Sequence, residues 1–113
     1  MIVEDEALVL MDIVMTVEEA GFDIHSECTT LTEAFAALEK GVPDIALLDI
    51  NIRHELIWPV ARKLRTQGCK VVFTSADCAH KELRTEFQDC AFVEKPVSPH
   101  AIGDALHETV AAE

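Results

Sequence analysis

The segment Ile45-Ala46-Leu47-Leu48-Asp49 constrains the fold more than any other part of the sequence. Four consecutive apolar residues, preceded by Gly41 and Pro43, predict a short strand that is covered on both faces, as in the centre of a parallel sheet. An ionised carboxylate needs compensating partners beside such a strand. We therefore expect Asp49 where the strand ends, at the edge where open α/β sheets bind ligands. Position alone leaves two interpretations open, a functional carboxylate and a helix-capping or loop residue.

Length and charge narrow the class of protein. The sequence has 113 residues, enough for one domain with a core, and a net charge of -12. Negative charge repels nucleic-acid phosphates and anionic membranes, so direct binding to either is not expected. No apolar run reaches the length of a membrane span, and no basic segment precedes an apolar one as in a signal peptide. These features predict a cytoplasmic protein.

Hydrophobic periodicity predicts five strands that alternate with five helices. Apolar or β-branched runs predict strands at 2–3, 22–27, 45–48, 71–75 and 90–93. Helical spacing, caps and prolines predict helices at 7–20, 30–40, 58–68, 79–87 and 98–110, of which the fourth is poorly amphipathic and expected to be short. This alternation is typical of a doubly wound α/β fold, with a parallel sheet and right-handed crossovers.

Three of these elements carry further expectations. Ile2-Val3 is shorter than the roughly five residues of a usual strand, so we expect the first strand to be truncated at the amino end of a single domain spanning 1–113. The segment 22–27 alternates apolar and polar residues, which suits an edge strand. The helix at 7–20 is apolar on more than one side, so its surplus apolar surface either covers a partner subunit or is deeply buried.

Cysteine and histidine spacing gives no sign of a zinc site or a disulfide framework. The cysteines form no C-x-x-C pair, and we expect all four to be buried thiols: Cys28, Cys69, Cys78 and Cys90. His100 and His107 share one helix face, but the sequence offers no third ligand at suitable spacing. We therefore expect both histidines on the surface.

Polar side chains collect at the carboxyl ends of four predicted strands: Glu4 and Asp5, Asp49, Thr74 or Ser75, and Lys95. Parallel strands end on the same side of a sheet, so these residues should converge. Three carboxylates so close together cannot all ionise without a cation, and hard oxygen ligands suit Mg²⁺. A lysine and a hydroxyl beside them are what a transferred phosphoryl group needs, as counter-charge and as hydrogen-bond donor.

These motifs resemble those of receiver (CheY-like) domains in two-component response regulators. The resemblance covers essentially the whole sequence, from Ile-Val-Glu-Asp-Glu at the start, through Leu-Leu-Asp-Ile-Asn and Phe-Thr-Ser-Ala, to Phe-Val-Glu-Lys-Pro. It implies a flavodoxin-like receiver fold with strand order 2-1-3-4-5. Ile57-Trp58-Pro59 is similar to a variant found in small stand-alone receivers, whereas Arg53, His54 and Glu55 replace the proline and glycine of many members.

The resemblance also implies a role for each residue at the strand ends. Those roles are phosphoacceptor for Asp49, direct Mg²⁺ ligands for Asp5 and Asp49, a water-mediated ligand for Glu4, a backbone carbonyl ligand from Asn51, a phosphoryl contact for Lys95, a hydroxyl switch for Ser75 or less readily Thr74, and an aromatic switch for Phe92. The implied partner is a sensor histidine kinase or a phosphotransfer protein. Without a following output domain, the implied readout is protein contact or a homodimer, and the chain is not expected to be an enzyme.

Three other functions remain as alternatives. A phosphate-independent interaction module would keep the fold and lack the chemistry, but the acidic cluster and Lys95 are complete. A small hydrolase or phosphatase with Asp49 as nucleophile would want a second acid two residues later, where Asn51 stands. A flavin-binding protein would want a glycine- or hydroxyl-rich phosphate loop after the first strand, and none follows.

Overall fold

Five short parallel strands form the centre of the structure, a computed structural model that describes residues 1–112. They are β1 (Ile2–Val3), β2 (Glu27–Cys28), β3 (Ile45–Asp49), β6 (Lys70–Ser75) and β7 (Ala91–Glu94). Their order in the sheet is β2-β1-β3-β6-β7, and every neighbouring pair is parallel. The predicted order of the five strands and the doubly wound α/β architecture are confirmed.

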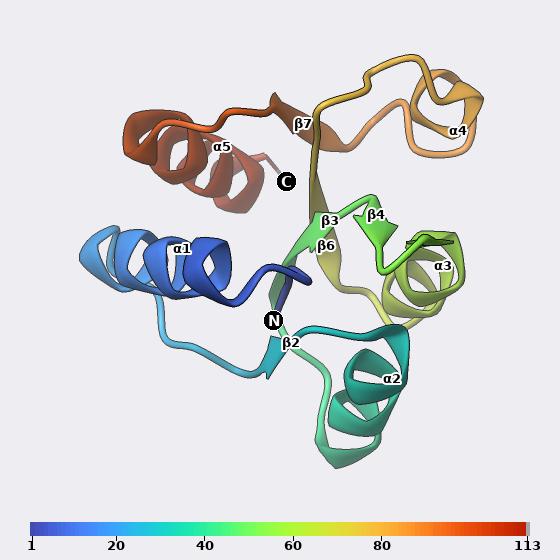
Figure 1. Cartoon of the computed structure of the whole chain (residues 1–113), viewed down its shortest axis with the longest axis horizontal. Coiled ribbons are helices and arrows are strands. Elements are labelled where there is room, and N and C mark those ends of the chain that lie inside the picture. The colour runs from blue at the N-terminus through green and yellow to red at the C-terminus, as the bar shows by residue number, and fades with distance from the viewer. Residues whose placement is uncertain (113) are drawn as a thin grey trace.

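Helices cover both faces of this sheet. On one side lie α1 (Ala7–Glu19) and α5 (Pro99–Ala111), and on the other lie α2 (Leu31–Lys40), α3 (Trp58–Thr66) and α4 (Lys81–Arg84) (Figure 1). The sheet separates two buried clusters, because successive side chains of a strand point to opposite faces. Leu47 and Val72 pack with α1 and α5, whereas Leu48 and Phe73 pack with α2 and α3.

Local sequence explains where the helices begin. The Thr30 hydroxyl accepts a hydrogen bond from the Glu33 N–H at 3.0 Å, and the Glu33 carboxylate accepts one from the Thr29 N–H at 2.7 Å. Ser98 caps α5 in the same way, with its hydroxyl accepting from the Ala101 N–H at 3.1 Å. These bonds satisfy backbone donors that would otherwise lack a partner in the first helical turn. The predicted capping patterns are therefore confirmed.

Two expectations about the backbone were wrong. The predicted elements leave residues 49–57 without regular structure, but β4 (Asn51–Ile52) and β5 (Glu55–Leu56) form an antiparallel hairpin there. Arg53 and His54 make its two-residue turn with positive φ angles of 49° and 68°, although such turns favour asparagine and glycine. The strand predicted at 22–27 does lie at the sheet edge, but it is regular only at Glu27–Cys28, because its neighbour β1 offers just two residues in register.

Exposure of side chains gives a mixed result for the other expectations. Cys28 and Cys69 are buried and Cys90 is half-buried, but Cys78 is exposed in the loop after β6, so that expectation was wrong for Cys78. His100 and His107 are exposed, as expected.

On α1 the surplus apolar surface is exposed rather than buried: Leu8 is 78%, Met11 60% and Met15 57% accessible. None of the helices among residues 1–112 has the length and apolar character that crossing a membrane requires.

Candidate phosphoryl and metal site

Three carboxylates meet where β1 and β3 end. Glu4 and Asp5 follow β1, Asp49 is the last residue of β3, and these two strands are neighbours in the sheet. One oxygen from each carboxylate lies within 4.8 Å of the other two. Glu4 is 1% and Asp49 6% exposed, so two of the three negative charges are nearly out of water. The structure thus places together the three acids that the sequence placed at strand ends.

Lys95 supplies the positive charge of this cluster. Its Nζ donates hydrogen bonds to Asp49 Oδ2 at 2.8 Å and to Glu4 Oε1 at 3.0 Å. The Lys95 backbone N–H donates to the Ser75 carbonyl at 2.9 Å. This bond holds the Lys95 backbone next to the end of β6, just after β7. One ammonium group therefore bridges two buried carboxylates that come from separate strands.

Burial dominates the ionisation of these groups. It raises the pKa of both Glu4 and Asp49, and the hydrogen bonds from Lys95 only partly oppose that effect. Burial alone would lower the pKa of Lys95, but the bonds to Asp49 and Glu4 outweigh it and the pKa is raised. A raised carboxyl pKa means that the ionised form is short of compensating charge. The cluster is thus electrostatically prepared for an additional cation.

Asp5 is held differently from its two neighbours. It is half-buried, and its Oδ2 accepts a hydrogen bond from the Arg53 backbone N–H at 2.9 Å. Burial acts to raise the pKa of Asp5, but this hydrogen bond and others outweigh it, so the pKa is lowered. Arg53 also donates from Nε to the Thr29 carbonyl at 3.2 Å, which ties the hairpin turn to the segment before α2. No pattern in the sequence predicted this contact.

Two hydroxyls are buried next to the cluster. Thr74 lies opposite Asp49 in the register of β3 and β6, and Ser75 is the next residue, with both 1% exposed. The Ser75 hydroxyl accepts a hydrogen bond from the Asp77 N–H at 3.1 Å, so the loop after β6 is fastened to that oxygen. A group that withdrew the Ser75 hydroxyl would change this loop. The assignment of Ser75, rather than Thr74, as the switch remains a prediction.

Asn51 and Phe92 are the remaining predicted site residues. Asn51 is exposed at the start of β4, and its backbone N–H is one of the hydrogen bonds that lower the pKa of Asp49 against burial. Phe92 is half-buried on β7, opposite Phe73, and packs against the hydrophobic core on the α2 and α3 side of the sheet. The metal-ligand role of the Asn51 carbonyl and the switch role of Phe92 stay predictions.

The donor set fits Mg²⁺ by its chemistry. Mg²⁺ prefers carboxylate and carbonyl oxygens and keeps several waters, so one or two carboxylates suffice to hold it. Asp5 is partly accessible and ionises readily, while Asp49 and Glu4 bring negative charge that Lys95 alone does not fully compensate. Soft ligands are absent from this group of acids.

Comparison with known proteins decides the family. The family model described as "Response regulator receiver domain" matches residues 1–107. The chain belongs to the response regulator receiver domain family. Receiver domains act in two-component systems.

Individual relatives of this receiver domain are distant. The transcriptional regulatory protein PdtaR of Mycobacterium tuberculosis is 24% identical over 106 residues, which are 94% of this chain and 52% of that protein. The chain therefore spans about half the length of that relative. A response regulator receiver protein from Sinorhizobium medicae superimposes with a TM-score of 0.85 at 25% identity, covering 98% of this chain and 92% of that one. The response regulator PhyR from Brucella abortus gives 0.82 at 27% identity, covering 97% and 46%.

Proposed function

We propose that this receiver domain is a phosphorylation switch in which Asp49 accepts the phosphoryl group. The observation that carries the proposal is the placement of Asp49: nearly buried, at the carboxyl end of the central strand, and bonded to Lys95 at 2.8 Å. The donor we propose is a phosphohistidine of a sensor histidine kinase or phosphotransfer protein. An Asp49 oxygen forms the new bond to phosphorus while the phosphorus–nitrogen bond breaks, and the electron pair leaves on the imidazole nitrogen.

The residues around Asp49 support this transfer. Lys95 carries the positive charge that the phosphoryl oxygens need, and its hydrogen bond to Asp49 puts that charge next to the attacking oxygen. Mg²⁺, held by Asp5, Asp49 and the Asn51 carbonyl with Glu4 acting through water, would supply further positive charge to those oxygens. The chain itself turns over no separate substrate in this proposal, so it acts as a switch and not as an enzyme.

The readout we propose is a change in protein contacts. The phosphoryl group would engage the Ser75 hydroxyl, which now accepts from the Asp77 N–H, and so would loosen the loop that leads to α4. The Phe92 side chain on β7 would then turn inward, so that the face formed by α4, β7 and α5 has two arrangements. Either a target protein or a second copy would bind one of them. A cytoplasmic location agrees with such a partner set.

Intact mass spectrometry after incubation with acetyl phosphate and Mg²⁺ tests the proposal. We expect a gain of one phosphoryl group, about 80 Da, that a chelator prevents and that Asp49→Ala abolishes. Asp12→Ala is the matched control, because it removes an exposed carboxylate of α1 and should leave labelling intact. Full labelling of Asp49→Ala would refute Asp49 as acceptor. No labelling of folded wild-type protein would instead favour the phosphate-independent interaction module.

A further inference from the structure

Two buried ring nitrogens lack a hydrogen-bond partner at one contact next to the start of α3. Among residues 1–112, the buried side-chain nitrogens and oxygens without a partner are Trp58 Nε1 and His80 Nε2. Their rings meet edge to face, with centroids 5.6 Å apart and an angle of 74° between the planes. Folded proteins pair nearly all of their buried polar atoms. This contact is therefore unfavourable as it stands and would gain from a new partner.

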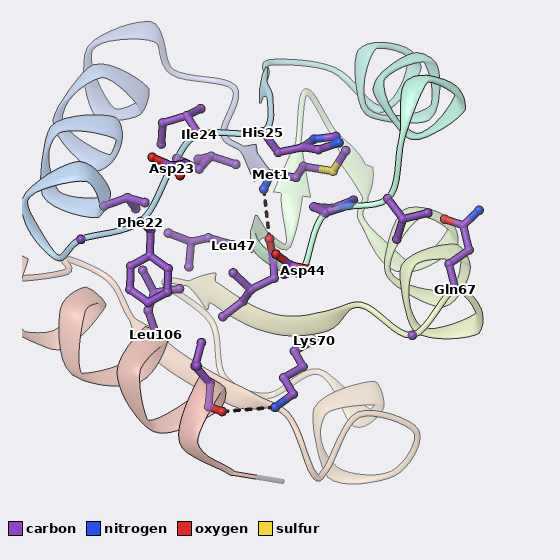
Figure 2. Close-up of a pocket in the computed structure, with 18 residues that line it drawn as sticks. Met1, Phe22, Asp23, Ile24, His25, Asp44, Leu47, Gln67, Lys70 and Leu106 are labelled. Atoms are coloured by element: carbon purple, nitrogen blue, oxygen red, sulfur yellow. Dashed lines mark hydrogen bonds between the residues drawn. The ribbon is translucent and has the colours of Figure 1, made fainter.

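A pocket of about 900 Å³ does not supply that partner. Phe22, Leu47 and Leu106 are among the residues that line it (Figure 2). Its lining includes the starts of β3 and β6, whereas His80 follows the end of β6, and neither Trp58 nor His80 belongs to the lining. The partner therefore has to be sought in the chain around His80.

The Asp77 carboxylate lies close enough to become a partner of His80. Its Oδ2 is 3.9 Å from His80 Nε2, which is beyond hydrogen-bond distance. A shift of about 1 Å would bring the two atoms to the usual length of such a bond. An imidazole N–H at Nε2 can donate to a carboxylate whether the ring is neutral or charged. The His80 side chain is 17% exposed and that of Asp77 63%, so the nitrogen, which water hardly reaches, gains more from the bond.

The bond between Ser75 and Asp77 keeps this approach from being completed. The Ser75 hydroxyl accepts from the Asp77 N–H at 3.1 Å, and Asp77 Oδ1 accepts from the Ala79 N–H at 2.9 Å. These two bonds fix the backbone and the side chain of Asp77 while its Oδ2 remains short of His80. Breaking the bond to Ser75 would free the backbone, and Oδ2 could then move toward the imidazole.

We propose that His80 is a positioning residue of the phosphorylation switch. When the phosphoryl group draws away the Ser75 hydroxyl, the Asp77 carboxylate closes onto His80 Nε2, and this bond holds the loop at 76–80 in its second arrangement. The inference rests on the proposed function and adds the bond that replaces the one between Ser75 and Asp77. Exchange of one hydrogen bond for another keeps the two arrangements close in free energy, as a two-state element requires.

His80 is placed to carry this change to α4. It directly precedes that helix, and its carbonyl accepts from the Leu83 N–H at 3.1 Å. Its ring packs on Trp58, which stacks in turn on Phe87 with centroids 5.5 Å apart. A pull by Asp77 on the imidazole would thus act on a residue that contacts both the first turn of α4 and the aromatic rings beneath it.

Replacing Ser75 by alanine tests the capture of Asp77 without any phosphoryl group. Ser75→Ala lacks the oxygen that accepts from the Asp77 N–H, so the carboxylate should close onto His80. We expect imidazole NMR spectra of the full chain to show a slowly exchanging His80 Nε2–H proton in Ser75→Ala and not in wild type. Thr74→Val is the matched control, because it removes the neighbouring buried hydroxyl and should leave the wild-type spectrum. Identical His80 spectra in folded Ser75→Ala and wild type would overturn the proposal.

Histidine variants test the same bond in protein labelled with acetyl phosphate and Mg²⁺. Hydrogen exchange at the Asp77 amide, followed by NMR, reports how often that N–H has left the Ser75 hydroxyl. We expect exchange about threefold to tenfold slower in phosphorylated His80→Phe than in phosphorylated wild type, because the released loop gains no new bond. His80→Gln keeps an N–H donor and should restore most of the rate. His100→Phe, at an exposed position of α5, should leave the rate unchanged.

The outcomes distinguish this inference from the proposed function. Wild-type exchange in labelled His80→Phe, or no rescue by His80→Gln, would overturn the role of His80 while Asp49 still accepts the phosphoryl group. Folded wild-type protein that takes no label would overturn the proposed function instead. The spectrum of Ser75→Ala would then decide by itself whether Asp77 pairs with His80.

Discussion

Asp49 sits where its ionised form is disfavoured. Burial raises its pKa, the nearby charge of Asp5 adds to that effect, and the hydrogen bond from Lys95 only partly offsets both. The folded protein therefore keeps the Asp49 proton to a higher pH than the unfolded chain does. Stability must fall as pH rises from the unfolded pKa through the raised folded pKa, because the unfolded state then binds fewer protons than the native state.

Replacing Asp49 by asparagine should stabilise the metal-free protein at neutral and alkaline pH. Asparagine keeps an oxygen for Lys95 and removes the charge whose burial is unfavourable. We expect Asp49→Asn to raise Tm at about pH 8 and to lose most of that advantage toward about pH 4, where carboxyl groups protonate. Thermal unfolding at a series of pH values checks this. Asp12→Asn, on the exposed side of α1, should change Tm little, and a lower Tm for Asp49→Asn at high pH would contradict the expectation.

The guanidinium of Arg53 should affect Mg²⁺ affinity although it does not touch the acids. Its bond to the Thr29 carbonyl holds the turn from which the Arg53 N–H reaches Asp5. Outer contacts that orient a ligand typically change metal affinity by about tenfold or more. We expect Arg53→Ala to weaken Mg²⁺ binding by roughly threefold to tenfold, measured by calorimetric titration.

His54 offers the matched control for that titration. It is the second residue of the same turn, is exposed and also has a positive φ, so His54→Ala introduces comparable backbone strain. Equal Mg²⁺ affinities of the two variants would remove Arg53 from the role of a positioning residue. If the wild-type protein bound no Mg²⁺ at all, the proposed metal site would fail instead.

For single residues, the sequence predicted which charged side chains would lie just after the ends of strands. Glu4, Asp5, Asp49 and Lys95 converge because parallel strands end at one edge, and that rule needs no knowledge of side-chain geometry. The contact between Arg53 and Asp5 escaped prediction because it depends on a hairpin whose turn lacks the usual asparagine and glycine. The segment from Asn51 to Leu56 has only two apolar residues, Ile52 and Leu56, too few to predict that hairpin.

Among the elements, α4 contributes least to its own position. It has four residues, none of them buried, so the segment after it must supply the anchor. Phe87 is 1% exposed, stacks on Trp58 with ring centroids 5.5 Å apart and meets the edge of Phe73 at 5.1 Å. Arg62 also pairs with Glu86 at 2.7 Å, but both side chains are exposed. Apolar packing should therefore hold this segment more firmly than the ion pair does.

Two substitutions compare these anchors. We expect Phe87→Ala to lower the free energy of unfolding by about 3–5 kcal/mol, as for other buried aromatic residues. We expect Arg62→Ala to lower it far less, because water screens an exposed ion pair. Urea unfolding followed by Trp58 fluorescence measures both. Similar costs for the two variants would show that the ion pair holds this segment as firmly as the aromatic cluster does.

Element prediction succeeded where burial and caps were strong. The strands at the centre and the capped helices α2 and α5 were found because apolar runs and capping residues act locally. The length of the edge strand at 22–27 was overestimated, because its regularity depends on pairing with β1. That strand is distant in the sequence and is itself paired with β3 on its other side. Alternation in the sequence says which face a residue takes, and pairing depends on what lies beside it.

For the molecule as a whole, Mg²⁺ and pH should act together on stability. A cation that binds only the folded state adds about 2.7 kcal/mol at a concentration one hundred times its Kd. Protons compete for Glu4 and Asp49, whose pKa values are raised by burial, so the gain should be present above those pKa values and disappear as pH falls through them. Millimolar MgCl₂ should raise Tm at about pH 8 and have little effect near about pH 4.

Sodium chloride at equal ionic strength is the control for that experiment. Screening alone would relieve repulsion in a chain of net charge -12, so both salts raise Tm somewhat. The additional rise in Tm in MgCl₂, compared with NaCl, measures cation binding at the acidic site. An excess that persists unchanged in Asp49→Asn and at low pH would place the cation elsewhere on the acidic surface.

The hydrogen bonds made by Lys95 join residues that are made at very different times during synthesis. That side chain joins Glu4, 91 positions earlier, and Asp49, 46 positions earlier. During synthesis both acids therefore emerge well before the lysine that pairs with them. Any product ending before Lys95 would hold Glu4 and Asp49 without that lysine. Such a fragment would leave the buried acids without their counter-ion, which disfavours burying them.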